Sequence, residues 1–300
     1  MNPEAALAYA ERHRLHALRI EVDGAVVFER YANGYDADKP HPLYSGTKSF
    51  WGVTAAAAHD DGLLELDETV AQTIPEWATD PRRARVTLRE LLALTSGIGF
   101  GGLGSAVPVY ERALETPIKD QPGERFTYGG IPLQVFGAVL ARKLASRTLT
   151  PHEYLRARLL DPVGVRIGSW RTLKDHRHPL PTGAFLAARE WCKYGRFILE
   201  RARHNGQALV REESLAACFT GSTANPHYGL GWWLAPLPLP PGIVHASGYG
   251  GQAMYIIPTE HAVVVKFGQS NSYKHDTFLK RLLSDGGAPD RDTRRLRGDR

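Results

Sequence analysis

The segment HPLYSGTKSF, residues 41–50, places a serine and a lysine three positions apart, Ser45 and Lys48. Pro42 blocks an earlier helix start, so the segment predicts a loop that enters a helix near Ser45. Residues three apart share a helix face, which brings the Lys48 amine within hydrogen-bond reach of the Ser45 hydroxyl. A serine hydroxyl needs an adjacent base to act as a nucleophile at neutral pH, and a lysine serves only when neutral. Burial and nearby positive charge lower a lysine pKa, so the chemistry is sound at this spacing.

Alone, the pair is a weak signal, because a chain of this length contains roughly one S-x-x-K by chance. The alternative interpretation is a serine that caps a helix and a solvated lysine one turn later. Two later motifs favour the catalytic interpretation. Tyr128 in FTYGG stands just before a helix that a proline starts, and HASGYGGQ, residues 245–252, enters a strand through a glycine-rich bend.

In this order the motifs resemble the class C β-lactamase-like serine hydrolases, which include penicillin-binding peptidases, carboxylesterases and nylon-oligomer hydrolases. S-x-x-K is a signature of penicillin-recognising enzymes. Other stretches look like the same family and extend the resemblance over residues 15–285: DGLLELDETV, LRELLALTSGI and YGLGWWL. Together these motifs are specific, although none is so by itself.

The resemblance implies a role for each matching residue. Ser45 corresponds to the nucleophile, Lys48 to its partner and Tyr128 to the group that carries protons to the leaving group. Which of Lys48 and Tyr128 takes the first proton stays open, and the two are expected to titrate as a coupled pair. The backbone N–H groups of Ser45 and of a residue near Tyr249 would form the oxyanion hole, each donor contributing about 3 kcal/mol. The substrate-binding candidates are Gly130, Ala246, Ser247, Gly248, Tyr44 and Gln252.

Two departures bear on substrate choice. The β-lactamases carry Tyr-x-Asn, and Gly130 stands at the asparagine place here. They also carry Lys-Thr-Gly, which aligns with Ala246-Ser247-Gly248, so alanine stands at the lysine place. His245 immediately precedes Ala246, the residue at the lysine place. Because alternate side chains of a strand point to opposite faces, His245 is expected to point away from the site. Both lost groups would hold an acidic, amide-bearing drug, so the chain is expected to resemble the esterase and nylon-oligomer branches.

Some aromatic and polar residues near these motifs have two interpretations. Tyr44 and Tyr249 flank the catalytic segments and either line the cleft or only pack. Gln252 either binds substrate or fills the bend. Trp232 and Trp233 alternate on a predicted strand, so one lies in the core while the other lies in the core or walls the pocket.

The patterning along the chain predicts an α+β fold. ALRIEVDGAVVFERY alternates apolar and polar residues around Asp23-Gly24, a strong hairpin signal. Strands return at YGLGWWLA, IVHASGYGGQAMYIIP and HAVVVKFGQ, the last two forming two more antiparallel strands, and YKHDTFLKRLLSDGG is a closing helix. Four helical segments lie between: LRELLALTSG, IPLQVFGAVLARKLA, PHEYLRARLLDPVG and AFLAAREWCKYGRFILERARHNG. Strands at both ends and helices between them predict an antiparallel sheet flanked by the N- and C-terminal helices, with an inserted helical domain.

The predicted boundaries follow from this pattern. Residues 1–60 and 228–287 form the sheet domain, and residues 61–227 form the helical domain. Residues 288–300 form a basic tail predicted to be disordered.

Composition excludes several function classes. The chain has 300 residues, 43% hydrophobic and 23% charged, with a net charge of +5. No basic stripe interleaved with aromatics appears, so no nucleic-acid partner is expected. No apolar run of about eighteen residues occurs, so no membrane-spanning helix is expected. The N-terminus lacks an apolar signal core, which predicts a cytoplasmic protein or a chain without its export leader.

Three further motifs are predicted to carry no cofactor or metal. GFGGLG, residues 99–104, fits G-x-G-x-x-G, but a predicted helix precedes it where a dinucleotide site needs a strand, so we expect a loop near the active site. DHRH, residues 175–178, has metal-ligand residue types but lies in a proline-flanked surface loop. Cys192 and Cys218 are expected to be free, half-buried thiols.

The sequence therefore predicts a serine hydrolase that needs no cofactor or metal and cleaves a small-molecule ester or simple amide through an acyl-Ser45 intermediate. The first rival is an amidase or peptidase of this fold, acting on D-amino-acid or 6-aminohexanoate amides, or a weak β-lactamase. The second is a binding or sensor protein of this fold that does not turn over substrate. The sequence leaves the oligomeric state open.

Overall fold

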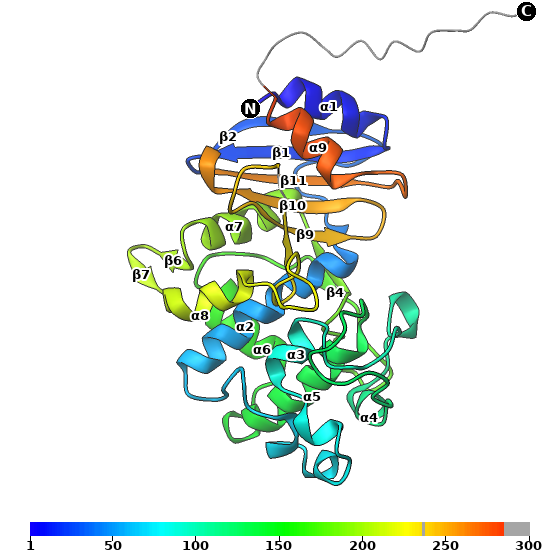
Figure 1. Ribbon diagram of the computed structural model, residues 1–300. Helices are drawn as coiled ribbons and strands as arrows, with labels where there is room; N and C mark the ends of the chain where they lie inside the picture. The colour runs from blue at the N-terminus through cyan, green and yellow to red at the C-terminus, as the bar shows by residue number, and fades with distance from the viewer. Residues whose placement is uncertain (236–237, 285–300) are drawn as a thin grey trace, which may run out of the picture.

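The computed structural model of the chain describes residues 1–235 and 238–284. Both ends of the chain build one six-stranded antiparallel sheet, in the order β2-β1-β11-β10-β9-β8 (Figure 1). Its strands are β1 (Leu15–Val22), β2 (Ala25–Tyr31), β8 (Trp233–Leu234), β9 (Val244–Gly248), β10 (Gln252–Ile257) and β11 (Ala262–Gly268). The pairing of β1 with β11 joins the two ends, which confirms the predicted α+β fold class.

The first hairpin forms where the sequence predicted it. Asp23 and Gly24 connect β1 to β2 with φ angles of 50° and 78°. A two-residue hairpin turn with both φ values positive matches the twist of the flanking strands, and Asp-Gly tolerates that conformation.

Helices cover both faces of the sheet. Helices α1 (Pro3–Glu11) and α9 (His275–Leu282) lie together on one face (Figure 1). Helix α7 (Ala188–Leu199) packs on the other face, against β10 and β11. A Cβ at Gly195 would lie 2.5 Å from Val263 Cγ1, so this glycine permits the close approach of α7 to the sheet.

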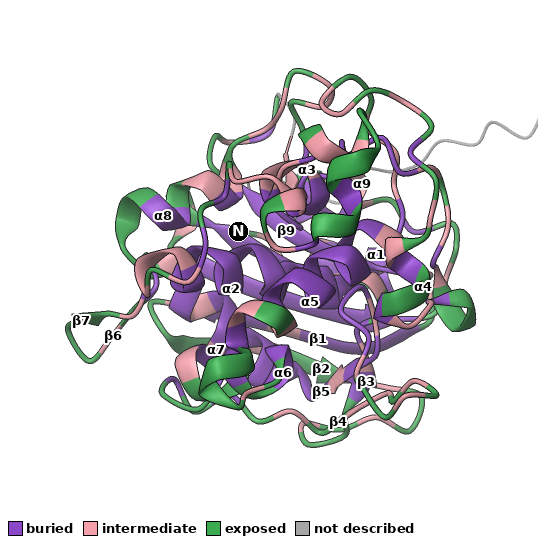
Figure 2. Cartoon of the chain, turned by 90° about the horizontal axis from the view of Figure 1, so that it is seen from below, coloured by how far each residue is buried: buried purple, intermediate pink, exposed green. Residues whose placement is uncertain are grey.

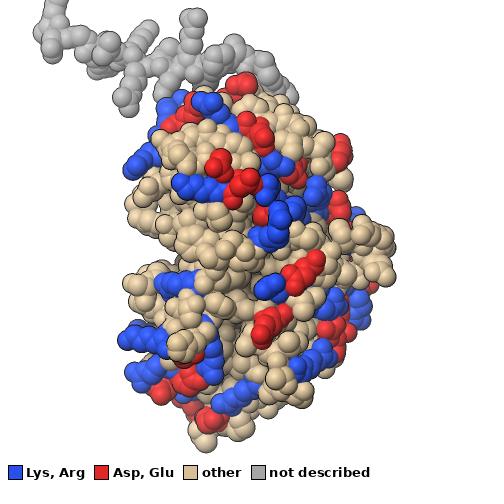
Figure 3. Space-filling model, turned by 180° about the vertical axis from the view of Figure 1, so that it is seen from behind, with Lys and Arg blue, Asp and Glu red and all other residues tan. Residues whose placement is uncertain are grey.

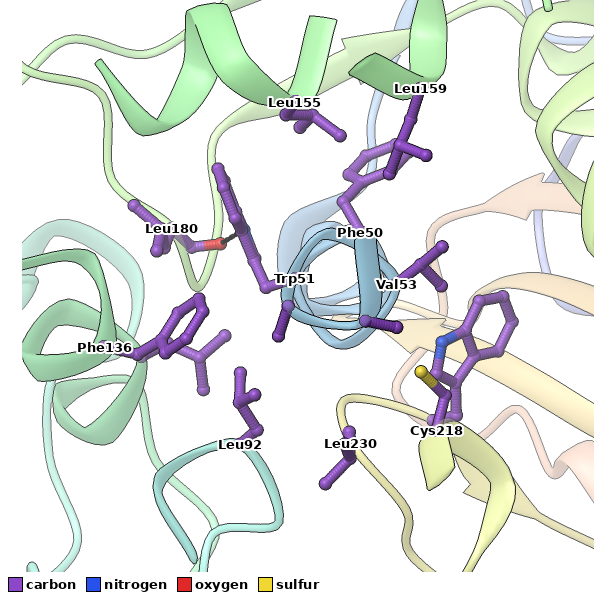
Figure 4. Close-up of a cluster of buried hydrophobic side chains, with 14 of the residues drawn as sticks. Phe50, Trp51, Val53, Leu92, Phe136, Leu155, Leu159, Leu180, Cys218 and Leu230 are labelled. Atoms are coloured by element: carbon purple, nitrogen blue, oxygen red, sulfur yellow. Dashed lines mark hydrogen bonds between the residues drawn. The ribbon is translucent and has the colours of Figure 1, made fainter. Parts of the chain in front are cut away.

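The rest of the molecule is built around helix α2, which follows the Ser45 segment and is buried on all sides (Figure 2). Apolar side chains from several surrounding elements converge on Phe50, Trp51 and Val53, and Trp51 also donates from Nε1 to the Leu180 carbonyl at 2.6 Å (Figure 4). Helix α2 spans Ser49–Asp60, and the helices around it are α3 (Leu88–Leu92), α5 (Ile131–Leu144), α6 (Pro151–Leu155), a π-helix at Arg156–Leu160, and α8 (Glu212–Ala216). Helix α4 (Tyr110–Leu114) packs against α5. A helix fixed in this way holds the Ser45 segment at its N-terminus in one place.

Some predicted elements differ in detail. The segment 243–258 forms two strands, because Gly250 and Gly251, with φ angles of 77° and 81°, turn the chain between β9 and β10. The helix expected from residue 184 begins at Ala188, because Ala184–Leu186 forms β5. This strand lies between β3 (His41–Pro42) and β4 (Ser169–Trp170) in a small sheet, and β6 (Arg203–His204) pairs with β7 (Gln207–Ala208).

The predicted domain boundaries stay a prediction, with α7 of the middle segment packing on the sheet. The predicted tail, 288–300, lies outside the described residues. Cys192 and Cys218 are free and fully buried, because both pack in the main core rather than at its edge. None of the described helices combines the length and the apolarity that a membrane crossing requires. Basic and acidic side chains are interspersed over the face drawn in Figure 3.

Candidate active site

Ser45 lies in a 3-10 helix, Tyr44–Lys48, that runs directly into α2. Residues i and i+3 of a 3-10 helix lie directly above one another, so the Ser45 and Lys48 side chains are aligned more closely than on an α-helix. Tyr44 enters this turn with a φ of 49°. A left-handed conformation at a non-glycine residue costs energy and persists only where its surroundings hold it. A Cβ at Gly46 would lie 2.9 Å from the Trp191 ring, so the turn is tightly packed from below.

The Lys48 amine is directed at the Ser45 hydroxyl. Its Nζ donates to Ser45 Oγ at 2.9 Å and to the Pro181 carbonyl at 3.2 Å. It also lies 4.9 Å from the centre of the Tyr128 ring. Lys48 is only 1% exposed, and burial lowers the pKa of its amine to about 7. A substantial neutral fraction at physiological pH is what a lysine base requires.

Tyr128 faces the same pair from the segment that leads into α5. Burial raises the pKa of its phenol, and a hydrogen bond with Ser45 acts in the opposite direction. Its ring stacks on Trp233 at 5.7 Å and 24°. The Tyr128 hydroxyl is therefore a protonated group next to the nucleophile.

These three side chains line a cleft of about 560 Å³. Lys48 is the sole Lys, Arg, Asp, Glu or His in its described lining, so the cleft offers a bound substrate little charge. Loop 99–104 lies at the cleft, as predicted. The full lining consists of Tyr44, Ser45, Lys48, Gly102, Leu103, Gly104, Tyr128, Pro181, Thr182, Trp233, Ser247, Gly248 and Tyr249.

Strand β9 contributes Ser247 and Gly248 to the wall of the cleft. A Cβ at Gly248 would lie 2.0 Å from the Leu43 carbonyl, so only glycine lets the strand run against the Ser45 turn. Tyr249 follows with a side chain 64% exposed, its ring edge-on to Tyr44 at 5.7 Å. The Tyr249 N–H donates to no protein group in the part of the chain that the structure describes. It is free to donate to a substrate oxygen.

Three of the expected substrate-binding residues do not line the cleft. Gly130 donates its N–H to the Gly101 carbonyl at 2.8 Å, and a Cβ there would lie 2.0 Å from the Gly102 carbonyl. The chain therefore needs glycine where the β-lactamases carry asparagine. Ala246 is 1% exposed and packs in the core.

Gln252 holds the turn between β9 and β10. Its Nε2 donates to the Tyr249 and Gly268 carbonyls at 2.8 Å and 2.7 Å, and its Oε1 accepts from the Gly268 N–H. All of its polar atoms are thus used by the backbone, and its position favours the bend over substrate contact.

Several residues near the cleft carry little sequence signal. Trp232 is fully buried, whereas Trp233 walls the cleft, as one of the two interpretations of the pair allowed. The Pro181 carbonyl, which accepts from Lys48, comes from a distant loop with no local motif. His275 at the start of α9 bonds to Ser247 at 3.0 Å, and His245 lies beside it rather than in the cleft. No group of metal-ligating side chains exists among residues 1–235 and 238–284.

Comparison with known proteins gives one family. A family model described as Beta-lactamase matches residues 10–286 of the chain. Among curated relatives, monacolin J acid methylbutanoyltransferase of Aspergillus terreus is 27% identical over 157 residues, 43% of this chain and 37% of that protein. The aligned part thus spans little more than a third of that relative. An uncharacterized protein of Alkalihalophilus pseudofirmus is 22% identical over 84% of each chain.

Solved structures share the fold at low sequence identity. A putative 6-aminohexanoate-dimer hydrolase from Bacillus anthracis has a TM-score of 0.77 at 18% identity, over 92% of this chain and 80% of its own. EstCE1, a hydrolase with promiscuous acyltransferase activity, has a TM-score of 0.74 at 16% identity, over 93% and 97% of the two chains. A family VIII carboxylesterase has a TM-score of 0.72 at 15% identity, over 93% and 95%.

Proposed function

The chain belongs to the beta-lactamase family of serine hydrolases, and we propose that it cleaves a small ester or a simple amide through an acyl-Ser45 intermediate. One observation carries the proposal. The Lys48 amine, buried and with its pKa lowered to about 7, donates to Ser45 Oγ at 2.9 Å inside an otherwise uncharged cleft. A neutral amine at that position can accept the serine proton, which is the step a weak nucleophile requires.

The proposed reaction has two halves. In the first, either Lys48 accepts the Ser45 proton, or Tyr128 accepts it after passing its own proton to Lys48, while Oγ attacks the carbonyl carbon. The N–H groups of Ser45 and Tyr249 stabilise the oxyanion. The leaving group then takes a proton from this pair and departs, leaving an ester on Ser45. In the second half a water molecule, deprotonated by the same pair, attacks that ester; the bond between the acyl carbon and Ser45 Oγ then breaks, and Oγ takes the proton back from the pair.

The absence of a second cation in the described lining of the cleft favours a neutral substrate. An acid such as a β-lactam needs a positive partner for its carboxylate, and an unpaired charge in a partly buried site is costly. The structural neighbours by their names include both an ester and an amide hydrolase, so the bond cleaved is part of the proposal.

A panel of p-nitrophenyl esters, nitrocefin and 6-aminohexanoate dimer, run on one preparation, tests the proposal. We expect turnover of short-chain esters and little or none of nitrocefin. Faster cleavage of the aminohexanoate dimer would favour the amidase, and acylation without turnover would favour a binding or sensor protein. Adding an alcohol to the ester assay shows whether the acyl group goes to water or to another acceptor. This test is included because one curated relative is named an acyltransferase, a methylbutanoyltransferase.

A further inference from the structure

A chain of four side chains leads from the cleft into the core beneath α9. Ser247 Oγ lies 3.0 Å from His275 Nε2, and His275 Nδ1 lies 2.7 Å from the Tyr255 hydroxyl. The Tyr255 hydroxyl lies 2.9 Å from that of Tyr273. Ser247 is the end that lines the cleft, and Tyr273, 7% exposed, is the inner end. No step of the proposed reaction uses this series of hydrogen bonds.

His275 is neutral in this position. Burial, aided by the nearby Lys266, lowers the pKa of its imidazole to about 4. A neutral imidazole carries one N–H donor and one acceptor nitrogen, so one of its two hydrogen bonds is donated and the other accepted. The three hydrogen bonds therefore run in one of two directions, with every proton donated toward Ser247 or every proton donated away from it.

The inner end selects the direction. In the described residues the Tyr273 hydroxyl has Tyr255 as its hydrogen-bond partner and no other. If Tyr273 donates to Tyr255, then Tyr255 donates to Nδ1 of His275, and the Nε2–H of His275 donates to Ser247 Oγ. Every proton then has an acceptor, and the Ser247 proton is left to point into the cleft.

The reverse direction leaves a buried donor without an acceptor. Ser247 would donate to His275, His275 to Tyr255, and Tyr255 to Tyr273, whose own proton would then have no acceptor among residues 1–235 and 238–284. A buried unpaired donor is destabilising. The first direction is therefore favoured.

We propose that His275, fixed by Tyr255, is a positioning residue that turns the Ser247 proton toward the cleft, so that Ser247 acts there as a hydrogen-bond donor to a substrate oxygen. This inference rests on the proposed function, because it concerns the same cleft. The described lining contains no carboxylate, and the Pro181 carbonyl already accepts from Lys48. Ser247 Oγ accepts from His275 with one lone pair, so toward the cleft it offers its proton to the carbonyl oxygen of a bound ester or amide.

The tautomer of His275 tests the positioning directly. Long-range 15N–1H spectra of histidine-labelled protein distinguish an imidazole protonated at Nε2 from one protonated at Nδ1, with His275→Gln identifying the signal. We expect the Nε2–H tautomer in the wild type and in Tyr273→Phe. Tyr255→Phe removes the partner of Nδ1 and should give a mixture.

The two tyrosine variants form a matched pair, because each removes one hydroxyl from neighbouring buried tyrosines and keeps the ring. A wild-type protein with Nδ1–H would overturn the proposal. So would a Tyr255→Phe protein that stays entirely Nε2–H, because Tyr255 would then not set the tautomer.

An ester and a matched amide test the donation by Ser247. Phenyl butyrate is followed by kcat/KM, and butyranilide by its Ki as a competitive inhibitor, which is measurable even without cleavage. Ser247→Ala should lower kcat/KM for the ester about fivefold, the value of one neutral hydrogen bond, and raise the Ki of the amide by a similar factor, because both carry a carbonyl oxygen. Ser247→Thr, which keeps the hydroxyl, should restore the ester value.

An unchanged kcat/KM and Ki in Ser247→Ala would overturn the donation to the substrate. Loss of the proposed function is separable from these outcomes. If Ser45→Ala keeps hydrolysing esters, the acyl-Ser45 mechanism fails while the His275 tautomer remains a valid measurement. If Ser45→Ala is inactive and His275 carries Nδ1–H, the present inference alone fails.

Discussion

Two buried lysines of this protein differ in what surrounds them. Lys48 and Lys266 are 1% and 0% exposed, and burial lowers the pKa of each amine to about 7. Neither forms an ion pair with a carboxylate in the described parts of the chain. Lys48 donates to the Ser45 hydroxyl in the cleft, whereas Lys266 donates to the Gly251 carbonyl at 3.0 Å and lies 3.9 Å from the centre of the Tyr273 ring.

The difference shows that a lowered pKa does not by itself identify a base. A base also needs a proton donor within reach and a space for the substrate. Lys48 has both. Lys266 has neither in the described structure, and its hydrogen bond instead supports the glycine turn that follows Tyr249.

The largest expected effect comes from the Ser45 hydroxyl, which lies beside Lys48 and has no counterpart beside Lys266 in the described residues. Ser45→Ala should remove nearly all ester hydrolysis and leave the circular dichroism spectrum and thermal midpoint close to those of the wild type. Mass spectrometry after fluorophosphonate treatment should find the adduct on the peptide that holds Ser45. An adduct on Ser96 or Ser247 would contradict the assignment.

Removal of the proton-transfer groups should have the next largest effect. Lys48→Ala and Tyr128→Phe should each lower kcat about 10²–10⁴-fold, the usual contribution of a general acid or base. Because the two side chains act on the same proton, the double variant should lose much less than the product of the single losses.

Lys266→Met is the matched control for the lysine change, and we expect it to keep kcat within a few fold of the wild type. If Tyr128→Phe keeps wild-type rates on esters and amides, then Tyr128 only walls the cleft.

The lack of another cation in the cleft predicts weak β-lactam hydrolysis. This protein has alanine at position 246 and glycine at position 130. Its kcat/KM for nitrocefin should therefore be about two to three decades lower than that of an enzyme with lysine and asparagine at those places. The kcat/KM for the neutral ester p-nitrophenyl butyrate should be little affected by the same two residues. Nitrocefin turnover as fast as that of the esters would show that these positions do not govern selectivity.

A third lysine sharpens this prediction. Ala246 is 1% exposed and packs in the core, so Ala246→Lys should lower the thermal midpoint by burying a charge, without giving nitrocefin hydrolysis at the rate of the esters.

The pH dependence should follow Lys48 alone. Because only the neutral amine accepts a proton, kcat/KM should rise with pH through about 7, where the Lys48 pKa lies, and fall about tenfold per unit below it. Lys266→Met should show the same profile. If the Lys266→Met profile loses its inflection near pH 7, that inflection reports the titration of Lys266 and not of Lys48.

The smallest effect concerns stability, in which the two lysines should behave alike. Between about pH 7 and pH 10 each lysine is charged in the unfolded chain and neutral in the folded one, so the unfolded state binds more protons. The free energy of unfolding should therefore rise with pH across this range. Urea titrations of Lys266→Met should show a flatter rise than the wild type, and an unchanged slope would contradict the lowered pKa.

Sequence patterns anticipated the local elements best where a residue type leaves little choice. Asp23-Gly24 predicted the first hairpin, because few dipeptides accept two positive φ angles. Pro132 in the first turn of α5 likewise marked the start of that helix. The pattern failed at residues 184–186, where an apolar run joined to a helix has no periodicity of its own and becomes a strand only by pairing with residues 41–42.

The sequence by itself determined the family, the α+β fold class and the order Ser45, Lys48, Tyr128, because these depend on residue types at fixed spacings along the chain. Only the tertiary structure decided what those residues meet. The Pro181 carbonyl against Lys48 and the chain from Ser247 to Tyr273 join segments far apart in the sequence. Burial is likewise a property of the folded molecule, and burial is what lowers the pKa of Lys48 enough for it to act as a base.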